Sequence, residues 1–305
     1  MRKDPIDFLR ALWRHANMLR RGKHPVYVDY ALRHRPRYGW GRPPHETLSA
    51  LLQRSCGRYE RFLESVAGCA DGLRRISVVS DGATDPYWMN GYVQDLDAAE
   101  LYALPCILES RRYVEIGSGH STRFVARARE DHGLDVRIVS IDPEPRAEID
   151  ALCDDLHRSP LEALPLDLFD ALEANDILMV DGSHRCFQNT DVSVVFLDIL
   201  PRLAPGVVVY LDDVFLPLDY PPEWEERHYS EQYLLAVLLL ADRGRRYEVL
   251  FPGYFSHVDP GLRRLTDDFW RDVAVPGLVR TQPNGFLLRI RDASREESGR
   301  APVGA

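Results

Sequence analysis

Apolar residues near the start of the chain recur at the three- and four-residue spacing of an amphipathic helix. One such set lies between Ile6 and Leu19, and a second lies between Leu48 and Val66. The segment from His24 to Pro44 separates them and is rich in Arg, Tyr, Pro and Gly, which is typical of an irregular connector. The pattern therefore predicts two helical regions joined by a loop.

Beyond Arg111, short runs of apolar and β-branched residues alternate with amphipathic segments. The runs lie at 113–116, 137–141, 177–180 and 207–211, and the helical patterns between them lie at about 120–131, 145–156 and 190–203. The same rhythm ends with a helix at about 230–243, for which Ser230 is the N-cap candidate, and with runs at 247–251 and 285–290. Strands that alternate with helices predict a doubly wound, Rossmann-like α/β sheet covered on both faces.

Two further signals lie ahead of the first predicted strand. The stretch over 80–94 is rich in turn-forming residues. Asp97-x-x-Glu100 then has the pattern of a capping box, which predicts a helix that begins there and runs towards Glu109.

Composition narrows the class of protein. Of 305 residues, 45% are hydrophobic and 28% charged, which is typical of a globular protein. The longest apolar run, Tyr233 to Ala241, is about half of the roughly 20 residues that a membrane-spanning helix needs, so we expect no membrane contact. The first residues carry no continuous apolar stretch before a cleavage-like site, so we expect a cytoplasmic protein. The cysteines have irregular spacing without a CxxC pair and are expected to be reduced thiols rather than a zinc ribbon: Cys56, Cys69, Cys106, Cys153 and Cys186.

Charge is unevenly distributed. Residues 1–75 carry a net charge of +9 and the remainder a net charge of −18, which gives −9 for the chain. The basic segment could bind an anionic partner, or it could dock on its own acidic domain or on a second subunit of a homodimer. Because the chain is acidic overall and its larger part has no Lys/Arg stripe, we do not expect it to bind nucleic acid.

A glycine-containing loop follows the first predicted strand, Glu115-Ile-Gly-Ser-Gly-His-Ser-Thr122. Gly117 and Gly119 permit a tight turn, and the amides of the next helix can meet a polar or anionic ligand. Thr122 stands where a dinucleotide fingerprint has its third glycine, which argues against NAD. Asp142, at the end of the second strand, can accept hydrogen bonds from both ribose hydroxyls of an adenosine ligand, unless it only forms an Asp-Pro turn.

Carboxylates follow the next two predicted strands. Asp181-Gly-Ser-His184 comes after 177–180, and Asp212-Asp213 comes after 207–211. If these strands are neighbours, Asp181, Asp212 and Asp213 share one crevice, where their repulsion calls for a cation; oxygen ligands favour Mg²⁺, Mn²⁺ or Ca²⁺. The alternative is that Asp212 caps a turn and only Asp213 faces the ligand. His184 suits a general base, or it is a structural histidine.

Taken together, these motifs resemble a class I S-adenosylmethionine-dependent methyltransferase over roughly Leu101 to Ile290. Segments at 176–184, 215–221 and 231–235 are similar to a bacterial subfamily called methyltransferase family 24. The resemblance implies a seven-stranded sheet of order 3-2-1-4-5-7-6 with the last strand antiparallel. It also implies this set of cofactor-binding residues: Glu115, Gly117, Ser118, Gly119, His120, Ser121, Thr122, Asp142, Asp181, Gly182 and Ser183.

The function that follows from the resemblance is transfer of a methyl group from S-adenosylmethionine to a hydroxyl of a small molecule. His184, Asp181 and Asp213 are the expected catalytic residues, and Mg²⁺ or another divalent cation at Asp181, Asp212 and Asp213 is an expected aid. Catechol-type O-methyltransferases are similar in the spacing of their metal-binding carboxylates, with a lysine base where this chain has His184. Two alternatives stay open: a non-catalytic protein that binds this cofactor or another adenosine ligand, and a methyltransferase that reaches RNA or protein through its basic N-terminal segment.

The expected organisation has three parts. Residues 1–94 form a helical N-terminal extension or cap, residues 95–292 form the cofactor-binding methyltransferase domain, and residues 293–305 form a disordered tail. Aromatic-rich stretches at 87–92 and 217–233 are candidates for covering the pocket, or they simply pack the two segments together.

Overall fold

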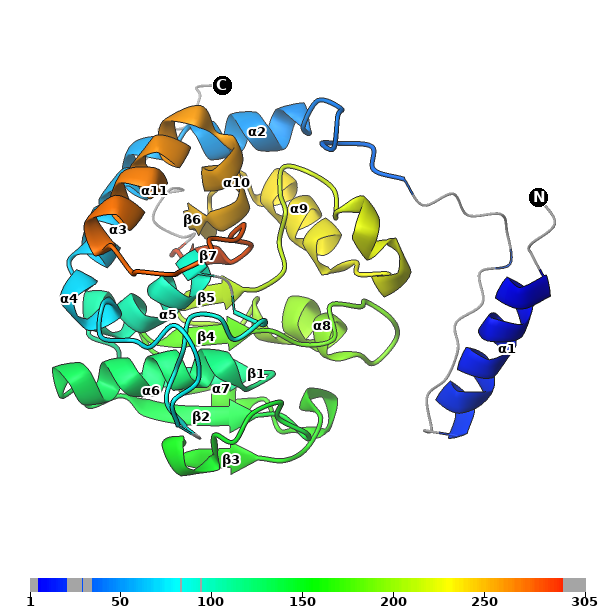
Figure 1. The fold of residues 1–305 in the computed structure, drawn as a ribbon, viewed down its shortest axis with the longest axis horizontal. Coiled ribbons are helices and arrows are strands. Elements are labelled where there is room, and N and C mark those ends of the chain that lie inside the picture. The colour runs from blue at the N-terminus through cyan, green and yellow to red at the C-terminus, as the bar shows by residue number, and fades with distance from the viewer. Residues whose placement is uncertain (1–4, 21–28, 30–34, 83, 94, 293–305) are drawn as a thin grey trace, which may run out of the picture. The chain divides into compact units, whose positions relative to one another are not determined.

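The computed structural model describes residues 5–20, 29, 35–82, 84–93 and 95–292. The chain divides into two units, residues 1–35 and residues 36–305. The first unit contains α1 (Pro5–Arg20), in agreement with the apolar spacing of that segment. The other described elements belong to the second unit (Figure 1). The predicted tail at 293–305 lies outside the described residues, and so do residues 24–28 and 30–34 of the connector predicted at 24–44.

The second unit combines a sheet with helices that precede, interrupt and follow it. Its helices are α2 (Glu46–Gln53), α3 (Cys56–Ala67), α4 (Ala70–Leu73), α5 (Asp95–Leu108), α6 (His120–His132), α7 (Asp167–Asp170), α8 (Asp191–Val194), α9 (Glu231–Asp242), α10 (Gly253–Val258) and α11 (Pro260–Val273). Its strands are β1 (Arg112–Ile116), β2 (Arg137–Ile141), β3 (Asp155–His157), β4 (Ile177–Val180), β5 (Val208–Leu211), β6 (Tyr247–Pro252) and β7 (Phe286–Ile290). Shorter helical turns are η1 (Asp150–Leu152), η2 (Leu161–Ala163), η3 (Val195–Ile199) and η4 (Pro222–Arg227).

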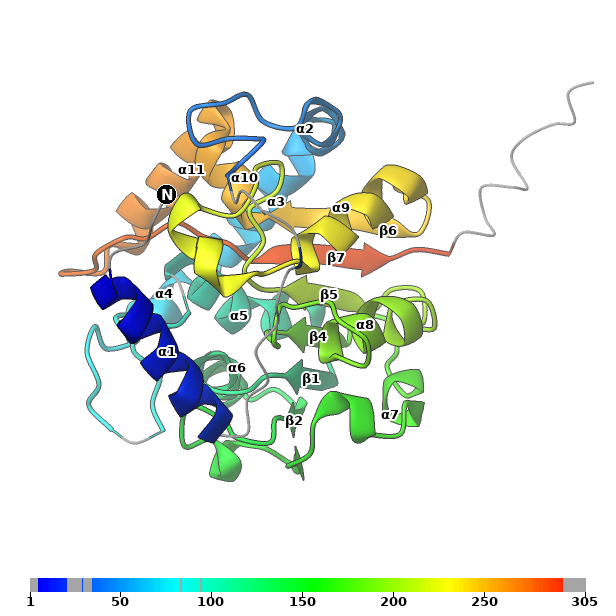
Figure 2. The same cartoon turned by 90° about the vertical axis from the view of Figure 1, so that its right-hand side faces the viewer.

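The strands form one seven-stranded sheet in the order β3-β2-β1-β4-β5-β7-β6. β7 runs antiparallel to β5 and β6, whereas the pairs among β1 to β5 are parallel. Figure 2 shows the β7 arrow pointing opposite to those of β1 and β4. The predicted fold class, with this strand order and an antiparallel last strand, is confirmed.

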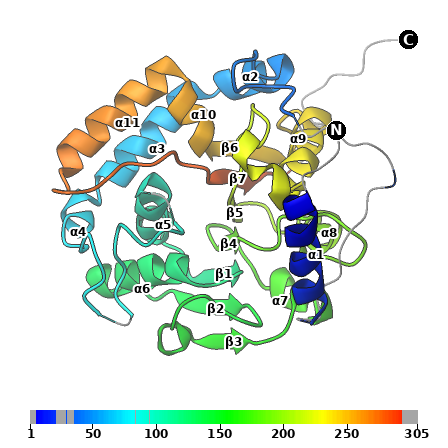
Figure 3. The same ribbon diagram turned by 45° about the vertical axis from the view of Figure 1, so that its right-hand side comes forward.

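The centre of the sheet explains why its strands read as continuous apolar runs. Every residue of β4 and β5 is buried. Figure 3 shows the reason, since α3, α5, α6 and α11 lie on one side of the sheet and α7, α8 and α9 on the other. A parallel sheet covered on both faces needs apolar side chains at successive positions rather than at alternate ones.

Helices α2 to α4 belong to the same compact unit as the sheet. α3 packs against α5, α11 and β6. Tyr59 of α3 is fully buried and meets the rings of Phe251 and Phe255 edge-on, at 6.2 and 6.5 Å between centroids. Arg58, the residue before Tyr59, forms an ion pair with Glu248 at 2.9 Å. This part of the N-terminal region therefore completes the hydrophobic core beside β6.

The prediction of a helix at 145–156 is wrong. This segment contains the single turn η1 and then β3, which pairs with β2 at the edge of the sheet. Asp154 explains the outcome, because its carboxylate accepts the backbone N–H of Ile138 at 2.7 Å and the guanidinium of Arg129 at 2.8 Å, which fixes the chain beside β2. A three-residue polar edge strand has no apolar alternation that a sequence pattern could reveal.

The capping box predicted at Asp97 and Glu100 is also wrong. α5 begins at Asp95, and both acids are buried within it. The Asp97 carboxylate instead accepts the backbone N–H groups of Asn284 and Gly285, each at 3.0 Å, and so holds the segment that leads into β7.

Among the described helices, none combines the length and the apolar character that crossing a membrane requires.

Candidate active site

A cleft of about 370 Å³ opens at the carboxyl ends of β1, β2 and β4. Most of the residues predicted to bind a cofactor line it: Gly117, Ser118, Gly119, His120, Ser121, Asp142, Asp181, Gly182 and Ser183. Glu115 and Thr122, which were predicted together with them, do not belong to its lining. The loop after β1 and the loop after β4 thus face one another across the same space.

Gly117 sets the close approach of these two loops. Its backbone has φ +82°, and a Cβ atom there would lie 1.8 Å from the carbonyl oxygen of Asp181. The Asp181 N–H in turn donates to the carbonyl of Ile116 at 2.8 Å, which continues the pairing of β1 with β4. Only glycine fits this position, because any side chain would meet backbone rather than a movable side chain.

Asp142 organises the loop from the neighbouring strand. Its carboxylate accepts the N–H of Ser118 at 2.9 Å and the N–H of Glu144 at 2.8 Å, one on each oxygen. Each carboxylate oxygen has a second lone pair, and the residue is partly exposed in the cleft. Asp142 therefore both braces the loop after β1 and offers two acceptors to a ligand.

Glu115 lies behind the loop and is fully buried. It accepts hydrogen bonds from the hydroxyls of Tyr113, at 3.0 Å, and Thr122. The Thr122 oxygen also accepts the N–H of Gly119 at 3.1 Å. Burial raises the pKa of Glu115 to about 7 despite these bonds. The residue supports the loop through Thr122.

Aromatic rings form one wall of the cleft. The His120 ring stacks on Tyr92, with 5.1 Å between centroids and 10° between planes, and meets Tyr87 edge-on at 5.5 Å. Arg146 lies over the Tyr92 ring at 5.7 Å. Burial, followed by the nearby Arg123, lowers the pKa of His120, so its ring is neutral near neutral pH.

His184 lies at the centre of an acidic cluster next to the cleft. Its Nε2 is 3.0 Å from Asp181 Oδ1 and 3.5 Å from Asp213 Oδ2, and its Nδ1 is 2.9 Å from Glu231 Oε2. The residue is only 2% exposed, and the Tyr229 ring covers it at 4.6 Å. Burial lowers the pKa of His184, but the hydrogen bonds to Asp181 and Glu231 outweigh it, so the pKa lies well above its usual value. Asp181 belongs both to this cluster and to the cleft.

Asp212 and Asp213 differ in their contacts with His184. Asp213 faces His184, and its Oδ1 accepts the side-chain amide of Asn284 at 2.9 Å. Burial raises the pKa of Asp213 to about 6. Asp212 is close enough to Asp97 and Glu100 to interact with their charges, and burial, then the charges of Asp181 and Asp213, raises the pKa of Asp212 well above the usual value.

The arrangement could hold a cation, but with a different set of ligands from the one predicted. Asp181, His184 and Asp213 each offer a donor atom, and these atoms lie within 4.8 Å of one another. Asp212, the third predicted ligand, is not a member of this group. Two carboxylates with one imidazole fit a divalent cation such as Mn²⁺ or Mg²⁺, and its binding would have to displace the proton between His184 and Asp181.

Two members of the cluster escaped the sequence reasoning. Glu231 opens α9, where an acid is ordinarily a capping residue, and no spacing signal connects it with His184. Asn284 comes just before β7. Its place in the cluster was predictable from the sequence, because an antiparallel strand begins at the edge of the sheet where its parallel neighbours end. Ser230 stands at the N-cap of α9 as predicted, although its hydroxyl accepts the N–H of Cys186 rather than capping the helix.

The two aromatic-rich stretches have different surroundings. Tyr92 from 87–92 lines the cleft. In 217–233, Trp224 and Tyr229 pack around a small core of Phe215, Tyr220 and Tyr254. The second stretch therefore packs as a satellite core, with Tyr229 as its contact to His184.

Residues 114–214, a third of the chain, match the model of a family described as a methyltransferase domain. No curated protein sequence matches the chain.

Several solved structures are similar to it. One is the MycE methyltransferase from the mycinamycin biosynthetic pathway in complex with Mg, SAH and mycinamycin VI, with 15% identity over 64% of this chain and 48% of that chain and a TM-score of 0.35. This chain thus spans about half the length of that protein. A second is the SAH-bound Podospora anserina methyltransferase PaMTH1, with 16% identity over 87% of this chain and 100% of that one and a TM-score of 0.38. A third is the branched-chain polyamine synthase from Thermus thermophilus in complex with N4-aminopropylspermidine and 5'-methylthioadenosine, with 16% identity, coverages of 94% and 79%, and a TM-score of 0.38.

Proposed function

We propose that this chain is a class I S-adenosylmethionine-dependent methyltransferase, supported by the match of residues 114–214 to a methyltransferase domain, and that it methylates a hydroxyl group on a small molecule. The observation that carries the proposal is the double role of Asp181. The residue lines the cleft, and its carboxylate contacts His184, which links the acidic cluster directly to the proposed site of the methyl donor. A hydroxyl must lose its proton as it accepts a methyl group, so such a cluster is needed beside the donor.

The cleft suits the cofactor in its polar and apolar parts. Asp142 would accept hydrogen bonds from the ribose hydroxyls, and the backbone at Gly117 to Ser121 would meet the methionine end. Ile141 and Leu161 add apolar surface to the same cleft, which suits the adenine ring. S-adenosylmethionine, when bound, supplies the methyl group on a sulfonium sulfur. Within this arrangement the protein's task is alignment of donor and acceptor.

We assign the hydroxyl's proton to the pair formed by Asp213 and His184. Glu231 and Asp181 hold the imidazole between them, and Asp213 is the remaining carboxylate, 3.5 Å from the ring. Burial raises the pKa of Asp213 to about 6. Asp213 is therefore ionised at neutral pH, and its pKa is close enough to 7 for it to act as a general base. Glu231 is a positioning residue, since it contacts the ring nitrogen that faces away from Asp213.

A divalent cation fits the same residues. Asp181, His184 and Asp213 would be its ligands, because their donor atoms lie close enough together and are of the oxygen and nitrogen type. Such an ion, when bound, lowers the pKa of a coordinated hydroxyl. We therefore include assistance by Mg²⁺ or a similar ion in the proposed function. The third ligand in this proposal is His184, whereas the sequence predicted Asp212.

The test is formation of S-adenosylhomocysteine with a panel of phenols, sugars and other alcohols, each paired with the matching amine, with and without a chelator. We expect turnover on a hydroxyl compound and not on its amine partner. Asp213→Asn should reduce the rate by about 10²- to 10⁴-fold, the usual contribution of a general base. His257→Gln, a change on α10 away from the cluster, should leave the rate unchanged.

Three results would contradict the proposal. Turnover on amines alone would exclude O-methylation, and turnover on RNA or protein would move the acceptor to another class. Cofactor binding without turnover on any acceptor in the panel would favour a non-catalytic binding protein.

A further inference from the structure

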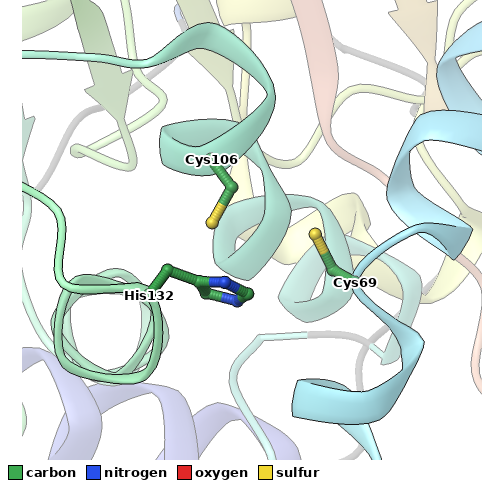
Figure 4. Close-up of side chains that lie close together, drawn as sticks. All are labelled: Cys69, Cys106 and His132. Carbon is green, nitrogen blue, oxygen red and sulfur yellow. The ribbon is translucent and has the colours of Figure 1, made fainter.

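A second group of metal-binding side chains lies away from the cleft. Cys69, Cys106 and His132 each offer a donor atom, and these atoms lie within 4.8 Å of one another. The residues come from the N-cap of α4, from α5 and from the last turn of α6. Figure 4 shows the three side chains pointing into one shared space between these helices.

The imidazole is held in the form that a metal ion requires. Tyr102 donates its single O–H to Asp131 at 2.7 Å. The same oxygen lies 3.1 Å from His132 Nε2 and can only accept a hydrogen bond from it. Nε2 therefore carries the hydrogen, and Nδ1 keeps its lone pair. Asp131 is fixed by Arg127 at 3.0 Å and Arg75 at 3.4 Å. Orientation of a histidine ligand by a hydrogen bond on its other nitrogen is a regular feature of metal sites.

The donor set matches zinc in number of charges and in spacing. Cys69 and Cys106 are both free thiols, and two thiolates neutralise a divalent ion. Zinc–sulfur and zinc–nitrogen bonds of about 2.3 and 2.0 Å in a tetrahedron separate the donor atoms by about 3.5 to 3.8 Å. The observed limit of 4.8 Å is within a small side-chain adjustment of these separations. Sulfur ligands select zinc over Mg²⁺ or Ca²⁺.

The location separates this group from methyl transfer. His132 ends α6, whereas His120, which lines the cleft, begins it, and the 13 residues of that helix span about 20 Å. Cys69 is buried and His132 is exposed, so the fourth position of a tetrahedral ion would face solvent. An ion here would join α4 to the two helices that cover the sheet.

We propose that Cys69, Cys106 and His132 bind a zinc ion, with water as the fourth ligand, and that this ion clamps α4 to α5 and α6. The inference does not depend on the proposed function. The cysteine spacing argued against a zinc ribbon, which takes its ligands from CxxC pairs. The proposed site differs from a ribbon because its three ligands come from three separate helical segments.

Cobalt substitution in the reduced, full-length protein tests the proposal. Co²⁺ bound to thiolates gives an intense ligand-to-metal charge-transfer band, whereas Co²⁺ at Asp181, His184 and Asp213 has no sulfur ligand and gives none. We expect one Co²⁺ per chain with this band, displaced by an equal amount of Zn²⁺. The band should disappear in Cys69→Ser and Cys106→Ser, and Cys153→Ser should keep it.

Two further variants test the site even if the cysteine variants fail to fold. His132→Gln alters an exposed side chain and should weaken Co²⁺ binding while the fold persists. Tyr102→Phe keeps all three ligands and should weaken binding by roughly 10- to 100-fold, the usual cost of losing the partner of a histidine ligand. No charge-transfer band in the reduced wild-type protein, or a band that survives both cysteine changes, would overturn the proposal.

Discussion

Replacing Gly117 by alanine tests how the loops after β1 and β4 build the cleft. The added Cβ would lie 1.8 Å from the Asp181 carbonyl oxygen and 2.7 Å from the carbonyl carbon. Both atoms belong to the backbone, so the clash can be relieved only by moving one loop. The residue also has φ +82°, a region where a side chain costs about 1–2 kcal/mol.

Gly133→Ala is the matched control. Gly133 ends α6 with φ +60°, and a Cβ there would meet no atom within 4 Å. It should therefore lose only the backbone cost of about 1–2 kcal/mol. Gly117→Ala should lose a further ~1–3 kcal/mol, the usual cost of forcing atoms into a filled space.

Urea unfolding of the two variants, at unchanged m-value, measures this difference in the free energy of unfolding. Gly117→Ala should also bind S-adenosylmethionine at least about tenfold more weakly, because the displaced Asp181 backbone carries Gly182 and Ser183 of the cleft. Gly133→Ala should bind it normally. Equal losses of stability in the two variants, or normal cofactor binding by Gly117→Ala, would refute this account of the loop.

Three further predictions concern Glu115, Glu231 and Tyr92. Burial raises the pKa of Glu115 from 4.5 to about 7. The protonated side chain therefore contributes to the free energy of unfolding fully below about pH 4.5, and this contribution is lost as the pH rises through 7. The total loss is about 3 kcal/mol. Glu115→Gln should remove this part of the pH dependence when urea unfolding is compared at about pH 5 and about pH 8, and an unchanged slope would contradict the assignment. Glu231→Gln should lower kcat at least about tenfold with the Kd for S-adenosylmethionine unchanged, since it positions His184 without lining the cleft; equal effects on both would indicate a general structural role. Tyr92→Ala should raise that Kd about fivefold, in line with ~1 kcal/mol for a stacked aromatic contact, and an unchanged Kd would remove Tyr92 from the cofactor site.

The parts of the fold that the sequence predicted are those with a strong local pattern. The central strands are apolar throughout because both faces are covered, and such runs are easily recognised. β3 has three residues, two of them polar, and depends on pairing with β2, so no local pattern marked it. The strand order came from the resemblance and not from periodicity.

The site was predictable as far as it lies at strand ends. Asp181 and Asp213 follow neighbouring strands, and the structure brings both to His184. Glu231 is 47 residues from His184 and reaches it from a helix, a contact that depends on how α9 packs. The same limit applies to the proposed zinc site, whose ligands become neighbours only when α4, α5 and α6 are packed.

The central claim is that the cleft beside Asp142 binds S-adenosylmethionine. Calorimetric titration of the cofactor into the purified protein, with and without Mg²⁺, tests it beside Asp142→Ala and the exposed acid control Asp198→Ala. We predict a Kd of micromolar order for the wild type and for Asp198→Ala. Asp142→Ala should weaken binding by at least about 100-fold, because it removes two hydrogen bonds to a charged acceptor at about 1.5 kcal/mol each. Absence of binding by the wild-type protein, or equal affinity in Asp142→Ala, would contradict the claim.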